Sequence, residues 1–139
     1  YLSDAIESSA KAPIIRCNDS ARFTHFADID QESVVVVENR GGTNQDFALQ
    51  YIKHATLVLY QKNYSALDSL TNAKSQSDVM FTDDVEVLYR HQINPQLCLA
   101  NIPEKFPASS KVFLFAKTDK GQELTKLFNE WWVLNKSEY

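Results

Sequence analysis

The chain has 139 residues, 44% of them apolar, and this length and composition suit one domain with a single buried core. Its 14 basic and 18 acidic side chains give a net charge of −4, and the basic residues are scattered, which argues against a nucleic-acid-binding surface. The apolar runs, such as residues 34–37, 112–116 and 131–134, are too short to cross a bilayer or to form a signal-peptide core.

The first part of the chain predicts an arm followed by a strand, a turn and a helix. Residues 1–12 are small and polar, so they predict an irregular arm or a short helix fragment. Residues 34–37 are four valines, followed closely by Gly41 and Gly42, which predicts a buried strand that ends in a tight turn. Apolar side chains at helical spacing over residues 47–52 then predict a helix.

The alternation of strands and helices continues to the end of the chain. Further strands are predicted over residues 55–60, 78–82, 97–102 and 111–117. Helices are predicted over residues 64–73 and 83–91, and a last helix begins near Asp119. Strands that alternate with helices of about ten residues predict an α/β fold with three layers and a mainly parallel sheet.

Two cysteines, Cys17 and Cys98, are the whole cysteine content of the chain. Each stands at the edge of an apolar stretch, where an ordinary buried thiol and a disulfide partner are both reasonable interpretations. Neither CxxC spacing nor a matching histidine cluster occurs, so we assign no metal and no cofactor. A disulfide would imply an oxidising compartment.

The turn after the valine strand is the first candidate binding element. Paired glycines at Gly41 and Gly42 let the backbone approach a ligand, and the N-terminus of the following helix suits a carboxylate or phosphate. The alternative is that the glycines only form the turn while Thr43 caps the helix together with Asp46. The turn lacks the residues of a P-loop and the third glycine of a dinucleotide fingerprint, which argues against nucleotide binding.

The second candidate is the acidic turn that follows the strand predicted over residues 78–82. Asp83, Asp84 and Glu86 place three carboxylates at a strand end, where they could bind an ammonium group or supply an acid with a raised pKa. The alternative is a capping box between Asp83 and Glu86. The isolated histidines and the tryptophans of the last helix are interpreted as surface, helix-end or packing residues.

A series of short segments along the chain matches the pattern of one protein family. In order, the segments are Cys17, Ala21-Arg22-Phe23, Asp28-Ile29-Asp30-Gln31, Gly41-Gly42-Thr43-Asn44, Asp78-Val79-Met80-Phe81-Thr82-Asp83, Glu86 and Asn94-Pro95-Gln96-Leu97-Cys98. This order resembles the family 3 extracellular solute-binding proteins, which have the type II periplasmic-binding-protein fold, and within them the cyclohexadienyl dehydratases. The likeness runs over nearly the whole chain.

The resemblance implies that the chain is the second of two α/β lobes, with the first lobe outside this sequence. On that basis residues 1–16 are an arm or crossover segment, 17–117 the core of the lobe and 118–139 the helix between lobes. The resemblance also implies a periplasmic location, and the contexts of Cys17 and Cys98 match it, so we predict a disulfide between them.

The resemblance also assigns roles to single residues. It implies that the turn holding Gly41, Gly42 and Thr43 contacts the carboxylate of a small anionic or zwitterionic metabolite. Asp83 would hold the amino group of that metabolite in an amino-acid binder, and Glu86 would be the general acid in a dehydratase. The full set of predicted ligand-binding residues is Asn39, Gly41, Gly42, Thr43, Asn44, Thr82 and Asp83.

Two main functions therefore remain open, beside a third alternative in which the family fold is the sensor part of a signalling protein. One is a receptor lobe for an amino acid or similar carboxylate, working with an ABC permease. The other is the lobe of a dehydratase for prephenate or arogenate, in which Glu86 must be protonated. Arg40 stands where the dehydratases have a proline, and Asp84 adds a charge, and both differences argue against prephenate.

Overall fold

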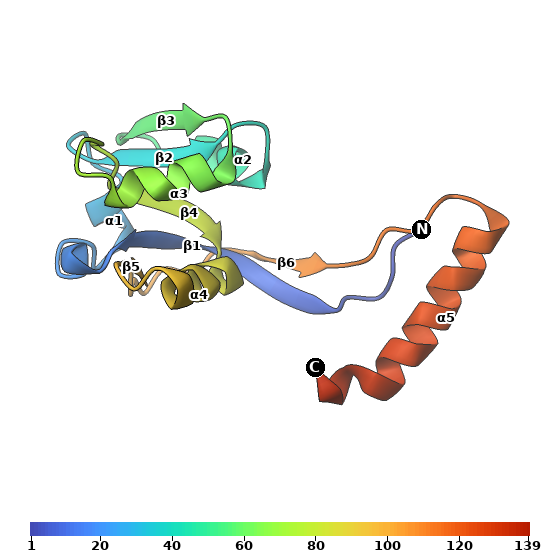
Figure 1. The fold of residues 1–139 in the computed structure, drawn as a ribbon. Coiled ribbons are helices and arrows are strands. Elements are labelled where there is room, and N and C mark those ends of the chain that lie inside the picture. The colour runs from blue at the N-terminus through green and yellow to red at the C-terminus, as the bar shows by residue number, and fades with distance from the viewer. The chain divides into compact units, whose positions relative to one another are not determined.

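The computed structural model describes residues 1–139 and divides into two compact units, Ala10–Pro107 and Tyr1–Ser9 with Ala108–Tyr139. The larger unit carries most of the regular structure (Figure 1). Its strands are β1 (Glu7–Arg16, from Ala10 on), β2 (Val35–Asn39), β3 (Thr56–Tyr60), β4 (Val79–Asp83) and β5 (Leu97–Leu99). Its helices are η1 (Cys17–Asp19), α1 (Phe26–Ile29), α2 (Thr43–Tyr51), α3 (Asn63–Thr71) and α4 (Asp84–Ile93).

The strands form one sheet in the order β3-β2-β4-β1-β5. β2 runs parallel to both β3 and β4, with Val36 opposite Leu57 and Val79. β1 runs antiparallel to both β4 and β5. The predicted α/β class is confirmed, and the sheet is mixed, because the parallel arrangement is confined to β3, β2 and β4.

Side chains on the two faces of the sheet form separate cores, which makes three layers. Consecutive residues of a strand point to opposite faces, so the β-branched run of β2 sends Val36 to one core and Val37 to the other. Phe47 of α2 and Ile29 of α1 belong to the first core. α3 and α4 cover the other face, where Leu67 and Val87 are buried. The strand of valines is therefore covered on both faces of the sheet, as its continuous apolar run predicts.

The smaller unit contains β6 (Ala108–Lys111), α5 (Asp119–Asn135) and η2 (Lys136–Glu138). β6 pairs with β1, and an antiparallel bridge joins Leu2 to Leu114. α5 begins at a Thr118 cap, whose side-chain oxygen accepts the Gly121 N–H. None of the helices combines the length and the apolar composition needed to span a bilayer.

Two sequence expectations about strands were wrong. Residues 7–12 belong to the ten-residue strand β1 rather than to an irregular arm or helix fragment. Their small polar side chains carry little strand signal, and pairing with a neighbouring strand decides the conformation. The strand expected over residues 111–117 is instead β6, Ala108–Lys111, and beyond it only the single bridge at Leu114 continues the pairing.

Candidate functional site

The predicted binding residues come together at one edge of the sheet. Asn39 ends β2 and Asp83 ends β4, and because these strands are parallel their carboxyl ends share an edge. In open α/β sheets ligands bind beyond this edge. α2 starts there at Thr43, immediately after the glycine turn. The candidate site is therefore formed by two strand ends and one helix N-terminus.

The glycine turn directs the backbone of α2 towards this edge. Gly41 has φ +78°, a left-handed conformation that suits glycine, and its N–H donates to Gln45 Oε1 at 2.7 Å. Gly42 is the N-cap, and its carbonyl oxygen accepts the first helical bond from the Asp46 N–H at 3.1 Å. The N–H groups of the first turn therefore have no acceptor inside the helix, and they are suited to an anion.

Lys11 is the centre of the hydrogen-bond network at this edge, and the sequence analysis did not identify it. Its ammonium Nζ donates to Thr43 Oγ1 at 3.0 Å, to Asn44 Oδ1 at 2.5 Å and to Asp83 Oδ1 at 2.9 Å. The side chains of Lys11 and Asp83 are 14% and 21% exposed, so this ion pair is shielded from bulk water on most sides. Lys11 thus joins the two turns that the sequence analysis selected.

Asn44 connects the remaining predicted residues. Its side-chain amide donates to Asn39 Oδ1 at 2.9 Å and, more weakly, to Thr82 Oγ1 at 3.5 Å. Asn44 is only 8% exposed, and Thr82 is buried. The amide therefore fixes the start of α2 against the ends of β2 and β4.

Glu86 lies one turn into α4 and is held by three neighbours. Its carboxylate accepts hydrogen bonds from Thr82 Oγ1 at 2.5 Å and Asn63 Nδ2 at 2.8 Å, and it pairs with Arg90 Nη2 at 3.1 Å. Burial alone would raise the pKa of this carboxyl, but the hydrogen bonds and the Arg90 charge outweigh burial and lower it. Glu86 is therefore an ionised, positioned carboxylate in the lobe as it stands, whereas a general acid must be protonated.

The helix-cap alternatives for these residues were wrong in their hydrogen bonds. Gly42, not Thr43, is the N-cap of α2, and the Thr43 hydroxyl accepts from Lys11. Asp83 is at the N-cap of α4, but its side chain makes no cap hydrogen bond. Competing partners account for both outcomes, because the Lys11 ammonium binds the Thr43 hydroxyl and the Asp83 carboxylate, and Arg90 pairs with Glu86.

Glu38 is a buried acid beside the site that the sequence analysis also missed. It is 0% exposed, its Oε1 accepts the Phe81 N–H at 2.8 Å, and its Oε2 has no hydrogen-bond partner. Burial raises the pKa of Glu38 to about 9, although the hydrogen bond from Phe81 and the charge of Lys11 act in the opposite direction. Glu38 is therefore neutral at pH 7, and a run of four valines before it gave no signal of this.

The predicted Cys17–Cys98 disulfide is present and closes 81 residues of sequence. It joins η1 to β5. His91 Nδ1 lies 4.0 Å from Cys98 Sγ and within 2.6 Å of the Leu97 carbonyl oxygen. The three side chains are close enough to share a metal ion, but the two sulfur atoms are bonded to each other and so do not offer thiolates.

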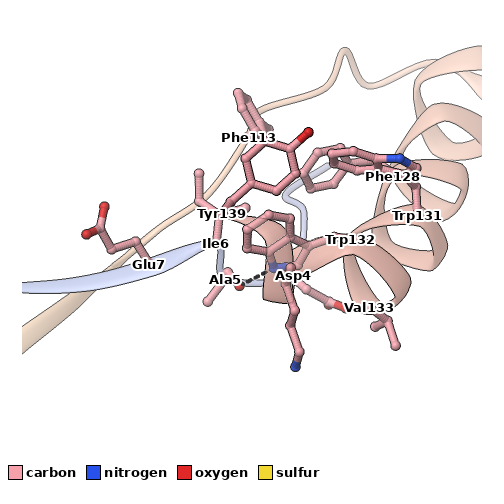
Figure 2. A pocket seen from close by; sticks show the side chains of 11 residues that line it. Asp4, Ala5, Ile6, Glu7, Phe113, Phe128, Trp131, Trp132, Val133 and Tyr139 are labelled. Atoms are coloured by element: carbon pink, nitrogen blue, oxygen red, sulfur yellow. Dashed lines mark hydrogen bonds between the residues drawn. The ribbon is translucent and has the colours of Figure 1, made fainter.

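A separate groove of about 870 Å³ lies within the smaller unit. Figure 2 shows that aromatic side chains dominate its lining. Trp132 Nε1 donates to the Ala5 carbonyl oxygen at 3.2 Å. Trp131 is 44% exposed and Tyr139 is 83% exposed. Such a lining suits packing against another apolar surface rather than recognition of a small charged metabolite.

No family model matches the chain, but individual proteins do. The chain is 29% identical over 119 residues to cyclohexadienyl dehydratase of Pseudomonas aeruginosa. The matched region covers 86% of this chain and 44% of that protein. The crystal structure of an ancestral cyclohexadienyl dehydratase is 31% identical, with a TM-score of 0.61, and the match covers 99% of this chain and 55% of that one. The chain thus spans about half the length of these relatives.

Amino-acid-binding proteins have a fold similar to that of this chain, although their sequence identity to it is low. An amino acid ABC transporter substrate-binding protein of Streptococcus pneumoniae, bound to L-arginine, matches the chain with a TM-score of 0.81 at 19% identity. The match covers 99% of this chain and 56% of that protein's chain. An ancestral amino acid-binding protein, described as a precursor of cyclohexadienyl dehydratase, matches with a TM-score of 0.79 at 19% identity. This match covers 98% of this chain and 56% of that protein's chain. The resemblance drawn from the sequence is confirmed, because the chain has the fold of a single lobe of these solute-binding proteins.

Proposed function

We propose that this chain, one lobe of the family 3 solute-binding fold, forms one wall of a cleft that binds an amino acid or a similar small carboxylate. The observation that carries the proposal is the meeting of the Lys11 ammonium with the first turn of α2 at the carboxyl ends of β2 and β4. A carboxylate seated there would receive backbone N–H groups, the positive end of a helix dipole and one fixed cation.

The similar proteins indicate what the whole protein would add to this lobe. They are about twice as long as this chain, so the opposite wall of the cleft would come from a first lobe. The relatives include a substrate-binding protein of an ABC transporter, which supports a periplasmic receptor that delivers its ligand to a permease. Because one wall buries only part of a ligand, we expect a dissociation constant on the order of 1 mM or weaker for the lobe alone.

The second candidate is a dehydratase lobe, which the sequence similarity to cyclohexadienyl dehydratase favours. In that reaction a protonated Glu86 would give its proton to a leaving hydroxyl group. The ion pair between Glu86 and Arg90 works against this role, because it keeps the carboxyl ionised. We therefore prefer the receptor function.

The proposal is tested by titrating the ¹⁵N-labelled chain with glutarate and following the backbone amide resonances. We expect shifts concentrated at residues 41–45 and 82–86, and we expect Thr43→Val to weaken binding several-fold through loss of the hydroxyl that helps to hold Lys11. Thr56→Val, at an exposed position at the start of β3, is the matched control and should leave the affinity unchanged. The absence of shifts at these amides with glutarate and also with L-glutamate, each up to 50 mM (roughly fifty times a dissociation constant of 1 mM), would refute the proposed function.

A further inference from the structure

We propose that Lys11 makes this lobe select carboxylates that lack an α-ammonium group, because the lysine occupies the oxygen cage in which that ammonium would bind. The inference rests on the proposed function and narrows its ligand class. It concerns three oxygen atoms from two turns, Thr43 Oγ1, Asn44 Oδ1 and Asp83 Oδ1, which lie within 3.0 Å of one ammonium nitrogen.

The cage matches the hydrogen-bonding capacity of an ammonium group. Such a group has three N–H donors and no acceptor, and Lys11 directs each donor to a different oxygen. A free amino acid would need the same kind of cage for its own α-ammonium. In this lobe it would have to displace a lysine that is covalently tethered beside the cage, so Lys11 competes at high effective concentration.

The backbone holds Lys11 in this position. β1 and β4 pair antiparallel with Lys11 directly opposite Asp83, so the two side chains leave the same face of the sheet. Two residues further along β1, Pro13 stands opposite Phe81 in the same ladder. The lysine is therefore a fixed part of the wall and only 14% exposed.

The charges around the cage favour an anion over a cation. Lys11 and Asp83 neutralise each other, as do Arg90 and Glu86 at the start of α4. Glu38, on the same edge of the sheet, is buried and uncharged at pH 7. The first turn of α2 adds the positive end of its dipole, so a second ammonium at the cage would meet this dipole end and the Lys11 charge, while the cage carboxylate, Asp83, is already paired.

A ligand that suits this wall has a carboxylate and, in place of the ammonium, a neutral or anionic group such as a ketone, a hydroxyl or a second carboxylate. The carboxylate can contact the α2 N–H groups while the three donors of the Lys11 ammonium stay in the cage. Lys11 would then be a specificity-determining residue, since it neutralises the Asp83 carboxylate that the site would otherwise present at the ligand's α-position.

The test uses two pairs of compounds that differ only in the α-substituent: 2-oxoglutarate with L-glutamate, and phenylpyruvate with L-phenylalanine. Dissociation constants are measured on the ¹⁵N-labelled 139-residue chain from the amide shifts of Gly42 and Thr43. We expect the oxo acid of each pair to bind at least about tenfold more tightly than the amino acid. Equal binding, or tighter binding of the amino acid, would overturn the inference without any use of variants.

Substitutions then locate the preference. Lys11→Met keeps the unbranched side chain up to its last atom and removes the charged nitrogen, which vacates the cage, so the preference should reverse in favour of the amino acid. Lys11→Arg keeps the charge and should keep the preference for the oxo acid. If Lys11→Met weakens both members of a pair equally, Lys11 is no specificity determinant and the inference is wrong. If no compound shifts these amides in any variant, the proposed carboxylate function itself has failed.

Discussion

Burial of Glu38 should make the stability of this lobe fall as the pH rises through the neutral range. The carboxyl is 0% exposed, and burial raises its pKa from an ordinary 4.5 to about 9. The folded lobe therefore keeps a proton that the unfolded chain releases above pH 4.5. Because the unfolded state binds fewer protons, the free energy of unfolding decreases with pH between these two values.

The size of the effect follows from the two pKa values. At pH 7 the unfolded carboxyl is 2.5 units above its pKa of 4.5 while the folded one is still protonated, which corresponds to about 3 kcal/mol of lost stability. Glu38→Gln keeps an oxygen for the Phe81 N–H and cannot ionise. We expect the variant and the parent to be about equally stable near pH 4.5, and the variant to be more stable by about 3 kcal/mol at pH 7.

Urea unfolding at a series of pH values, with the disulfide intact, measures this difference. Far-ultraviolet circular dichroism is the appropriate signal, because both tryptophans lie in α5 and report on the smaller unit. The gap between variant and parent should widen by about 1.4 kcal/mol per pH unit from pH 5 to pH 8. Glu32→Gln, at an exposed position, is the matched control. Parallel curves for Glu38→Gln and the parent would refute the assignment of a neutral, buried Glu38.

Three further changes test other parts of the account. Arg90→Gln removes the cation beside Glu86, so it should raise the pKa of that carboxyl in a ¹³C NMR titration and cost about 0.5 kcal/mol; an unchanged titration would exclude the ion pair. Replacing Cys17 and Cys98 by alanine opens a loop of 81 residues and should lower the unfolding free energy by up to about 4.5 kcal/mol, whereas unchanged urea midpoints would show that the bond is absent or energetically silent. Gly41→Ala forces a side chain into left-handed backbone at φ +78° and should cost about 1 kcal/mol, measured by thermal unfolding; a stability gain would contradict the turn geometry.

Sequence patterns predicted those parts of the fold in which local preference and burial agree. The four valines before Glu38 predicted β2, and the helical spacing after the glycine turn predicted α2. β1 was missed because its first residues are polar and adopt a strand only through pairing with other segments. The local sequence of a segment does not show which distant segment it will pair with.

The same reason explains which site residues could be predicted. Gly41 and Asp83 stood out because glycines and carboxylates after a strand carry a local signal. Lys11 did not, because its role depends on the β1–β4 register that sets it opposite Asp83, 72 residues away in sequence. Glu38 was missed because nothing in the valine run indicates that an acid will be enclosed there.

The most direct test of the account is a crystal structure of the chain grown with 2-oxoglutarate. We expect the α-carboxylate to lie against the N–H groups of Thr43 and Asn44 at the start of α2, with the Lys11 ammonium still in contact with Asp83. A ligand bound elsewhere on the lobe, or a Lys11 side chain expelled from the cage by the ligand, would contradict it.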